Sequence, residues 1–577
     1  MNLPNQEKRK HIGKFVLAYA GVSWIIIQVV ALIISQYDWP IAFLDITILL
    51  FIFGLPATIV YAINGNVLNN RLKLIYGVNV FLAISVIAYY FIKPDSLQPN
   101  QIKFLKFKDS QKEIAQNIES IAVLPFSNFT GDSDKEYLSY AIHDALISEI
   151  GSLSSLRVKS KTSTLALKEQ NKSLEEIADE LNVDAVIEGS IVTAGNNLKV
   201  NVSLVSVFPE EFQLWTKDYE VTMAQLLNVY SSITKNLAEE IDLPLTKLEL
   251  NNLEQEFVVN PAAYEAYLKG KYHMGLLTKE DIIAAQKYFE QAIEIDSNFA
   301  PAYAALGGVW GFLKQMNFVT TDQAAPFFGP NIEKAKTLNP NLADVYYWEA
   351  IKLIWTDYNW DEGEKAFLKA LELNPNSSES RGLYANFLLG QNRIVEAREQ
   401  MDIALSLDPK NPFIQVLNSV NLFTERNYSD CIELASKLQQ MIPDNPLINL
   451  SLFMSYSQIK DDDNFINQAK IWLELEGHNE EAVILIEEYK NSNLKNALLK
   501  TCSALEQKDP SSLMAQTMFN FYAIAGETDK TMDWVEKSYI RRDPDVPFLN
   551  MVPTLDPYRN NPRLIEVIQR LKFQNPN

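Results

Sequence analysis

The sequence predicts a multi-domain protein with a three-helix transmembrane bundle, an α/β domain and an all-α solenoid of repeats. Three observations predict this order. Three long apolar segments lie within the first 92 residues, residues 156–221 alternate between polar and apolar on a period of two, and prolines recur every 34 or 35 residues in the carboxy-terminal half. At 577 residues the chain is long enough for about three or four domains.

The first predicted element is the membrane bundle at 15–92. Residues 15–35 contain no charge over 21 positions, a length that spans a hydrocarbon core of about 30 Å as a helix. Residues 41–63 and 74–92 are similarly long and almost free of charge. We therefore expect three spans and the lipid bilayer as a partner.

Basic residues set the expected orientation. Four of them precede the first span, and Arg71 and Lys73 lie between the second and third. Because basic loops favour the cytoplasm, residues 1–14 are predicted to be a short cytoplasmic amino terminus. Three spans then place the linker at 93–118, and everything beyond it, in the periplasm of a bacterium, with the spans in the inner membrane.

Strands and helices alternate after the linker. Strands are predicted at 120–126, 156–160, 184–194, 197–208 and 212–221, with helices at 134–150, 173–182 and 222–241. Ser173 and Glu176 have the spacing of a capping box. Gly195 and Asn196 supply the backbone freedom of a hairpin turn.

The order of these segments resembles a known family. "SIAVLPFSN", "LRVKSKTST", "ADELNVDAVIEGSI", "NNLKVNVSLV" and "QLWTKDYE" are similar to the TolB amino-terminal-like domain, also called FlgO-type, over residues 119–245. In bacterial membrane proteins this domain commonly precedes tetratricopeptide repeats, and a cyclase or winged-helix output domain can stand before the membrane segment. Family members usually carry Asp and Gly where this chain has Tyr140 and Ala141.

The turn after the first strand bears on chemistry, because phosphate sites often lie at strand-to-helix turns. A phosphate cradle needs several glycines, and this turn has only Gly131. Asp132, Asp134 and Glu136 would repel an anion, and they favour the start of the following helix. A calcium site and an acid/base role for His143 are the less favoured interpretations.

The proline ladder predicts the repeats. Pro340, Pro375, Pro409 and Pro443 are 35, 34 and 34 residues apart, and Gly477 falls where the next proline would stand. This period resembles tetratricopeptide repeats, helix-turn-helix units that stack on their neighbours, over residues 260–545. Residues 314–331 are longer than an inter-helix turn and are expected to form a lid or edge contact. Residues 546–577 are predicted to cap the array.

Composition narrows the possible functions. The net charge is −21, with 72 acidic and 51 basic residues. Binding to a phosphate backbone requires clustered Lys and Arg, so no nucleic-acid partner is expected. Two cysteines and four histidines offer no metal-ligand spacing, and no nucleotide loop or catalytic triad is present. We expect no metal, no cofactor and no enzymatic activity.

The resemblance implies a scaffold that binds other proteins in the groove formed by the first helices of its repeats. The repeat register predicts the groove residues to be Asp344, Tyr347, Ile351, Trp355, Asn386, Phe413, Val416, Val420 and Phe423. The alternative is a signal-transducing regulator that senses a periplasmic ligand and acts through a membrane partner. The partner, the pathway and the oligomeric state are not predicted by the sequence.

Overall fold

The computed structural model describes most of the chain, which divides into two compact units, residues 1–109 and residues 110–577. The described residues are 5–37, 42–64, 77–78, 80–81, 84–85, 114–131, 135–167, 170, 172–194, 197–208, 211–255, 259–276, 279–315, 318–508, 515–543 and 545–573.

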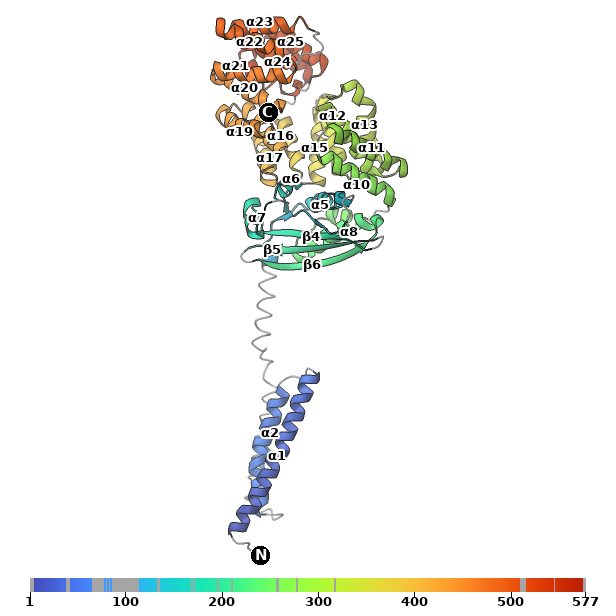
Figure 1. Cartoon of the computed structure of the whole chain (residues 1–577), viewed down its shortest axis with the longest axis vertical. Coiled ribbons are helices and arrows are strands. Elements are labelled where there is room, and N and C mark those ends of the chain that lie inside the picture. The colour runs from blue at the N-terminus through green and yellow to red at the C-terminus, as the bar shows by residue number, and fades with distance from the viewer. Residues whose placement is uncertain are drawn as a thin grey trace. The chain divides into compact units, whose positions relative to one another are not determined.

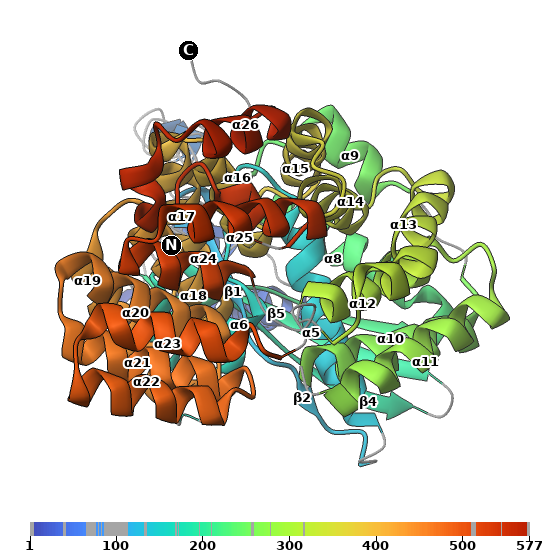
Figure 2. The same cartoon turned by 90° about the horizontal axis from the view of Figure 1, so that it is seen from above.

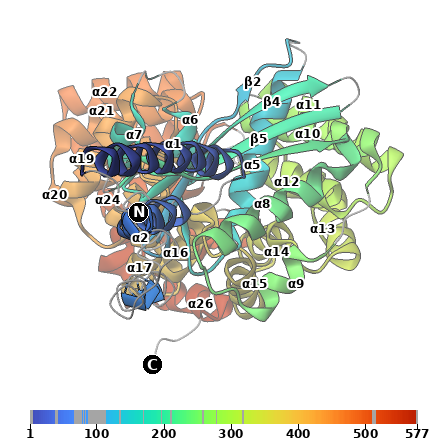
Figure 3. The ribbon, with the colours of Figure 1, turned by 90° about the horizontal axis from the view of Figure 1, so that it is seen from below.

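The first unit contains helices α1 (Asn5–Tyr37) and α2 (Ala42–Asn64), which pack side by side (Figure 3). One segment, Ile12–Leu32, is long and apolar enough to cross a membrane, and the apolar stretch Leu44–Pro56 of α2 is shorter. The predicted third span, 74–92, lies mostly outside the described residues. The described part of this unit therefore contains one candidate span, where the sequence predicts three.

The second unit begins with a mixed sheet. Its order is β3-β1-β4-β5-β6, with β2 also beside β4. The strands are β1 (Ser120–Val123), β2 (Ser127–Asn128), β3 (Arg157–Val158), β4 (Ala185–Ala194), β5 (Asn197–Ser206) and β6 (Phe212–Val221). β1 pairs in parallel with β3 and β4, and β4, β5 and β6 form an antiparallel meander.

Helices cover both faces of the sheet because its side chains alternate in direction. Ile121 and Val123 pack in one cluster with α5 (Glu136–Gly151) and α8 (Leu226–Glu240). Ala122, between them, packs with α7 (Leu174–Leu181) on the other face. The predicted capping box of α7 is confirmed, with Ser173 and Glu176 bonding each other's backbone N–H. The short helices α6 (Lys161–Leu165) and α9 (Lys247–Leu253) complete this domain.

The rest of the described chain is an all-helical array of tetratricopeptide-like helix pairs (Figure 2). The pairs are α10 (Pro261–Leu276) with α11 (Lys279–Ile295), α12 (Ala300–Gln315) with α13 (Thr321–Leu338), α14 (Ala343–Trp355) with α15 (Trp360–Leu373), α16 (Ser378–Gly390) with α17 (Ile394–Leu407), α18 (Pro412–Thr424) with α19 (Tyr428–Met441), α20 (Pro446–Ile459) with α21 (Asp462–Leu475), α22 (Asn479–Asn491) with α23 (Leu494–Leu505), and α24 (Ala515–Ala525) with α25 (Thr528–Arg541).

Small residues let the two helices of a pair approach closely. A Cβ on Gly307 of α12 would lie 2.6 Å from Ile332 Cδ1 of α13, and one on Gly363 of α15 would lie 2.4 Å from Ile354 Cγ1 of α14. Cys431 takes a similar small-residue position and is fully buried. Residues 314–331, expected to form a lid or edge contact, instead contain the end of α12 and the first turns of α13, which begins at Thr321.

The chain ends in a segment that turns back on the array. It consists of the 3₁₀ turns η4 (Val546–Phe548) and η5 (Pro553–Tyr558) and helix α26 (Pro562–Leu571). Arg563 of α26 pairs with Glu536 of α25 at 2.8 Å. At the other end of α26, Trp360 Nε1 of α15 donates to the Leu571 carbonyl at 2.5 Å, and the Trp360 ring stacks on Phe573.

Candidate functional site

The predicted groove begins on α14. Asp344, Tyr347, Ile351 and Trp355 are three or four residues apart and so share one side of the helix. Ile351 is 2 % exposed and belongs to the core, whereas Tyr347 and Trp355 are partly exposed and Asp344 is exposed. The Trp355 ring also packs edge-on against Phe367, with centroids 6.3 Å apart.

The remaining predicted residues divide in the same way. Asn386 of α16 is buried and donates a hydrogen bond to Asn421 of α18. Val416 is buried in the cluster formed by α18, α19 and α20. Phe413, Val420 and Phe423 are partly exposed. Three of the nine predicted residues thus serve packing, and six keep some accessible surface.

The α/β domain covers part of the array, which the sequence did not predict (Figure 1). Asn376, in the turn between α15 and α16, inserts its amide among backbone groups of the α/β domain. Its Nδ2 lies 3.0, 3.2 and 2.9 Å from the carbonyls of Gly151, Leu153 and Leu156, and its Oδ1 accepts from the Val158 N–H at 3.0 Å. This turn is therefore a docking point between the two domains.

The turn between α17 and α18 is a second docking point. Ser163 of α6 donates to the Asp408 carboxylate at 2.6 Å. The Ser160 N–H donates to the Leu407 carbonyl at 3.3 Å, and Lys410 forms an ion pair with Glu180 of α7. Asn376 and Asp408 occupy successive repeat turns, so the α/β domain binds the edge of the array where one pair passes to the next.

A charged cluster fixes α5 to the first helix pair. Asp144 of α5 lies 2.6 Å from Lys161 of α6 and 3.2 Å from Lys271 of α10. Burial alone would raise the pKa of Asp144, but the two lysines outweigh it and hold that pKa well below its usual range. The carboxylate therefore stays ionised and acts as a bridge between three helices.

A cavity of about 540 Å³ remains between α5, α8 and the first helix pairs. Asp144, Tyr267, Lys271 and the predicted groove residue Asp344 line it. Burial, with carboxylates nearby, raises the pKa of Tyr347 well above its usual value. Asp344, the first residue of the predicted groove, therefore faces a cavity that is also lined by the chain's own α/β domain.

The position where the family usually carries Asp also contributes to this contact. Tyr140 of α5 packs edge-on against Tyr272 of α10, with centroids 5.5 Å apart. A Cβ on Gly275 would lie 1.7 Å from the Tyr140 hydroxyl, so glycine is the residue that admits this ring. In this chain the position serves domain docking.

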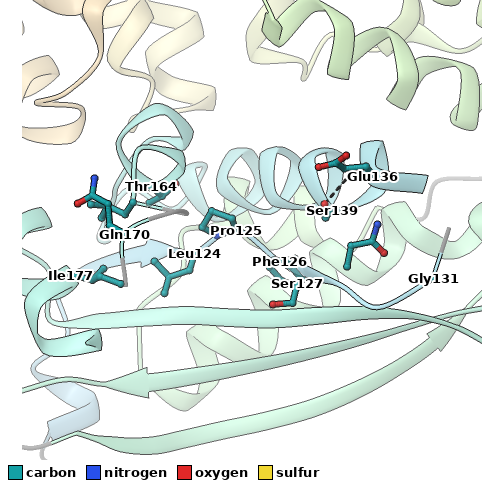
Figure 4. A pocket seen from close by; sticks show the side chains of 12 residues that line it. Leu124, Pro125, Phe126, Ser127, Gly131, Glu136, Ser139, Thr164, Gln170 and Ile177 are labelled. Carbon is teal, nitrogen blue, oxygen red and sulfur yellow. Dashed lines mark hydrogen bonds between the residues drawn. The ribbon is translucent and has the colours of Figure 1, made fainter. Parts of the chain in front are cut away.

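A second pocket, of about 610 Å³, lies at the turn between β1 and α5 (Figure 4). Apolar side chains line it together with Glu136, Ser139, Thr164 and Gln170. Pockets at the carboxyl ends of parallel strands are common ligand sites. Ser139 is committed to a hydrogen bond with the Glu136 carbonyl at 3.0 Å.

His143 belongs to the scaffold of the α/β domain. It is fully buried, and its Nε2 lies 2.8 Å from the Val123 carbonyl and 3.1 Å from Thr164 Oγ1. Within the described residues, no group of three or more His, Cys, Asp or Glu side chains is arranged to hold a metal ion.

Two family models match parts of the chain. Residues 116–232 match the second domain of HilA/YgeH-like transcriptional regulators, and residues 366–399 match a tetratricopeptide repeat. The sequence led us to expect the TolB amino-terminal-like family for the first region, whereas the model that matches is the HilA-type one. The expected kinship with cyclases and regulators agrees with the names of the relatives below.

Two curated relatives show the extent of the similarity. The putative adenylate cyclase 3 of Rhizobium meliloti is 27 % identical over 249 residues, which cover 43 % of this chain and 42 % of that protein. The transcriptional regulator HilA of Salmonella typhimurium is 24 % identical over 295 residues, covering 50 % and 51 %. The chain thus spans about half the length of these relatives, or less.

Two solved structures are distant matches. Pseudomonas aeruginosa PilF matches at 20 % identity with a TM-score of 0.28, covering 37 % of this chain and 91 % of that one. Yeast Tom70 matches at 15 % identity with a TM-score of 0.32, covering 81 % and 96 %. By the family models, residues 116–232 are similar to the second domain of HilA/YgeH-like regulators, and residues 366–399 to a tetratricopeptide repeat.

Proposed function

We propose that this chain is a membrane-anchored scaffold that binds other proteins through its repeat array. The observation that carries the proposal is the stack of helix pairs from α10 to α25, whose first helices present partly exposed Phe413, Val420 and Phe423 on α18. Such stacks bind extended or helical segments on the face formed by their first helices.

The proposed location of the chain is a bacterial inner membrane, with the repeat array in the periplasm. The apolar segment Ile12–Leu32 supports an anchor in a bacterial inner membrane. The basic residues before it support a cytoplasmic amino terminus, and with the two further apolar segments at 41–63 and 74–92 the array lies in the periplasm. We also propose that the chain has no catalytic activity.

Site-specific photo-crosslinking in membranes tests the scaffold. A photoreactive phenylalanine analogue replaces Phe413 or Phe423 in the full chain, and the matched control replaces Val395, which is 73 % exposed on the second helix α17. The expected result is one discrete adduct from both α18 positions and none from position 395. Identical adducts from all three positions, or none from α18, would refute the groove as the binding surface.

A second candidate function is ligand sensing. The match of residues 116–232 to a regulator domain and the pocket of about 610 Å³ beside α5 support it. In this case a periplasmic small molecule binds the pocket, and a partner protein in the membrane transmits the signal. A neighbouring cyclase or response-protein gene favours sensing, and neighbouring envelope-assembly genes favour the scaffold.

A further inference from the structure

The carboxy-terminal segment lies against the first helices of the repeats, where a partner of such an array would lie. η4 packs against α16, and η5 packs against α20 and α24. All three are first helices of their pairs. The sequence predicted that residues 546–577 cap the end of the array; α26 does pack on α25 of the last pair, whereas residues 545–558 lie against the first helices α16, α20 and α24.

Apolar anchors hold the segment in place. Val546, Leu549, Val552 and Leu555 are 0, 0, 6 and 0 % exposed, and all belong to one core cluster with residues of α16, α20 and α24. They recur every third residue, which is the period of a 3₁₀ helix. Val546 lies in η4 and Leu555 in η5, and Leu549 and Val552 flank these turns. One side of the segment is therefore continuously apolar.

Polar contacts add specificity. Both oxygens of the Asp556 carboxylate lie 3.0 Å from Arg426 Nη2, in the turn between α18 and α19. Thr554 donates a hydrogen bond to Asn520 of α24, and the Tyr558 hydroxyl donates to the Ala523 carbonyl at 2.9 Å. The array thus supplies a cation and fixed acceptors at defined distances from the apolar anchors.

The groove is shaped to admit a backbone. A Cβ on Gly390, the last residue of α16, would lie 2.4 Å from the Pro547 carbonyl oxygen. Glycine is a poor helix former, but any larger residue here would push the segment away. Gly390 is therefore a positioning residue for the segment.

We propose that the inner face of α16–α24 is a peptide-binding groove and that residues 545–558 are its resident ligand. A partner bound there supplies a segment of the same chemistry: apolar anchors every third residue, prolines that keep it out of a regular helix, and a carboxylate for Arg426. This inference rests on the proposed scaffold function and names its partner class. Because the resident segment is tethered, the partner competes with a high local concentration of it.

The test loosens the resident segment and leaves the groove intact. Leu549→Asp/Leu555→Asp in the full chain removes two anchors, and a fluorescein-labelled synthetic peptide of residues 545–560 is the probe. Fluorescence anisotropy is expected to show binding at least tenfold tighter than to the unchanged chain, and a scrambled peptide is expected not to bind.

Two further substitutions show whether the peptide occupies the groove. Adding Gly390→Ala to the loosened chain is expected to abolish peptide binding, because the new methyl group meets the Pro547 carbonyl of the peptide. The matched control is Gly329→Ala, on α13, where a Cβ meets only the flexible Lys352 side chain; it is expected to leave binding unchanged. Equal effects of the two substitutions would overturn the proposal.

A charge reversal avoids disturbing the apolar anchors. In the full chain, Arg426→Glu is expected to bind a peptide carrying Asp556→Lys at least tenfold tighter than the native peptide. Hydrogen exchange across α18 reports that the array remains folded. The inference would be overturned if neither the Leu549→Asp/Leu555→Asp chain nor the Arg426→Glu chain binds a peptide while α18 remains protected from hydrogen exchange. Peptide binding without any photo-crosslinked partner would instead refute the proposed scaffold function and leave the groove in place.

Discussion

Asn376→Ala tests the docking of the α/β domain on the array. The Asn376 amide has two protons for three carbonyls, and its oxygen accepts one N–H, so it makes about three full hydrogen bonds. At about 1 kcal/mol each, and with water replacing part of the loss at a partly exposed site, the substitution is expected to cost about 2 to 3 kcal/mol of docking free energy.

The Val158 amide reports this loss directly, since its hydrogen is bonded to the Asn376 side chain. Hydrogen exchange of that amide in the full chain is expected to accelerate about 30- to 150-fold. The matched control is Asn341→Ala, at the corresponding position one repeat earlier. Its side chain has one long contact, of 3.5 Å, with Asn252, so little change is expected. Unchanged protection of Val158 in Asn376→Ala, or an equal loss in both variants, would refute the docking role.

Three more predictions follow from individual residues. Burial raises the pKa of Asp545 to about 7. The folded protein therefore gains stability from this group below about pH 4 and loses it as the pH rises through 7, by up to about 4 kcal/mol. Asp545→Asn should reduce the difference between the melting temperatures at pH 5 and pH 8, and an unchanged difference would contradict this prediction. Gly307→Leu should unfold the amino-terminal repeats in circular dichroism melting, because the new side chain would clash with Ile332. Trp355→Ala should retain the fold and weaken partner binding by about 1 to 3 kcal/mol. Equal loss of structure in both variants would place Trp355 in the core. Alkaline phosphatase fused after residue 110 should be active and a cytoplasmic reporter there silent, and the reverse pattern would disprove the periplasmic location.

Structural features that depend on residues close together in the chain were predictable from the sequence. The capping box of α7 forms between Ser173 and Glu176, and β6 occupies 212–221, as predicted. Both depend on interactions between residues that are close in the chain or that alternate along it. The five-residue helix α6 was missed because it is too short to show an apolar period. Helix α13 was missed because Pro326 and Pro330 lie inside it and usually end a helix.

The candidate site was less predictable, for a different reason. The repeat register places residues such as Asp344 and Phe413 on one side of their helices, but it does not say what covers that side. Nothing in a 34-residue period indicates that Asn376 meets the α/β domain or that Val546 meets α16. Partners far apart in the chain leave no periodic pattern, so only the folded structure could identify them.

The contact between Trp360 and the Leu571 carbonyl joins residues 211 positions apart. In an open solenoid each repeat touches only its neighbours, so such arrays fray from their ends and lose repeats one at a time. Here α26 links α25 to α15, and the last pair is held to a pair near the middle of the array. Because of this bridge, the helix pairs between α15 and α25 should unfold together. Mechanical pulling on the carboxy terminus should accordingly give one large rupture before any stepwise release of repeats.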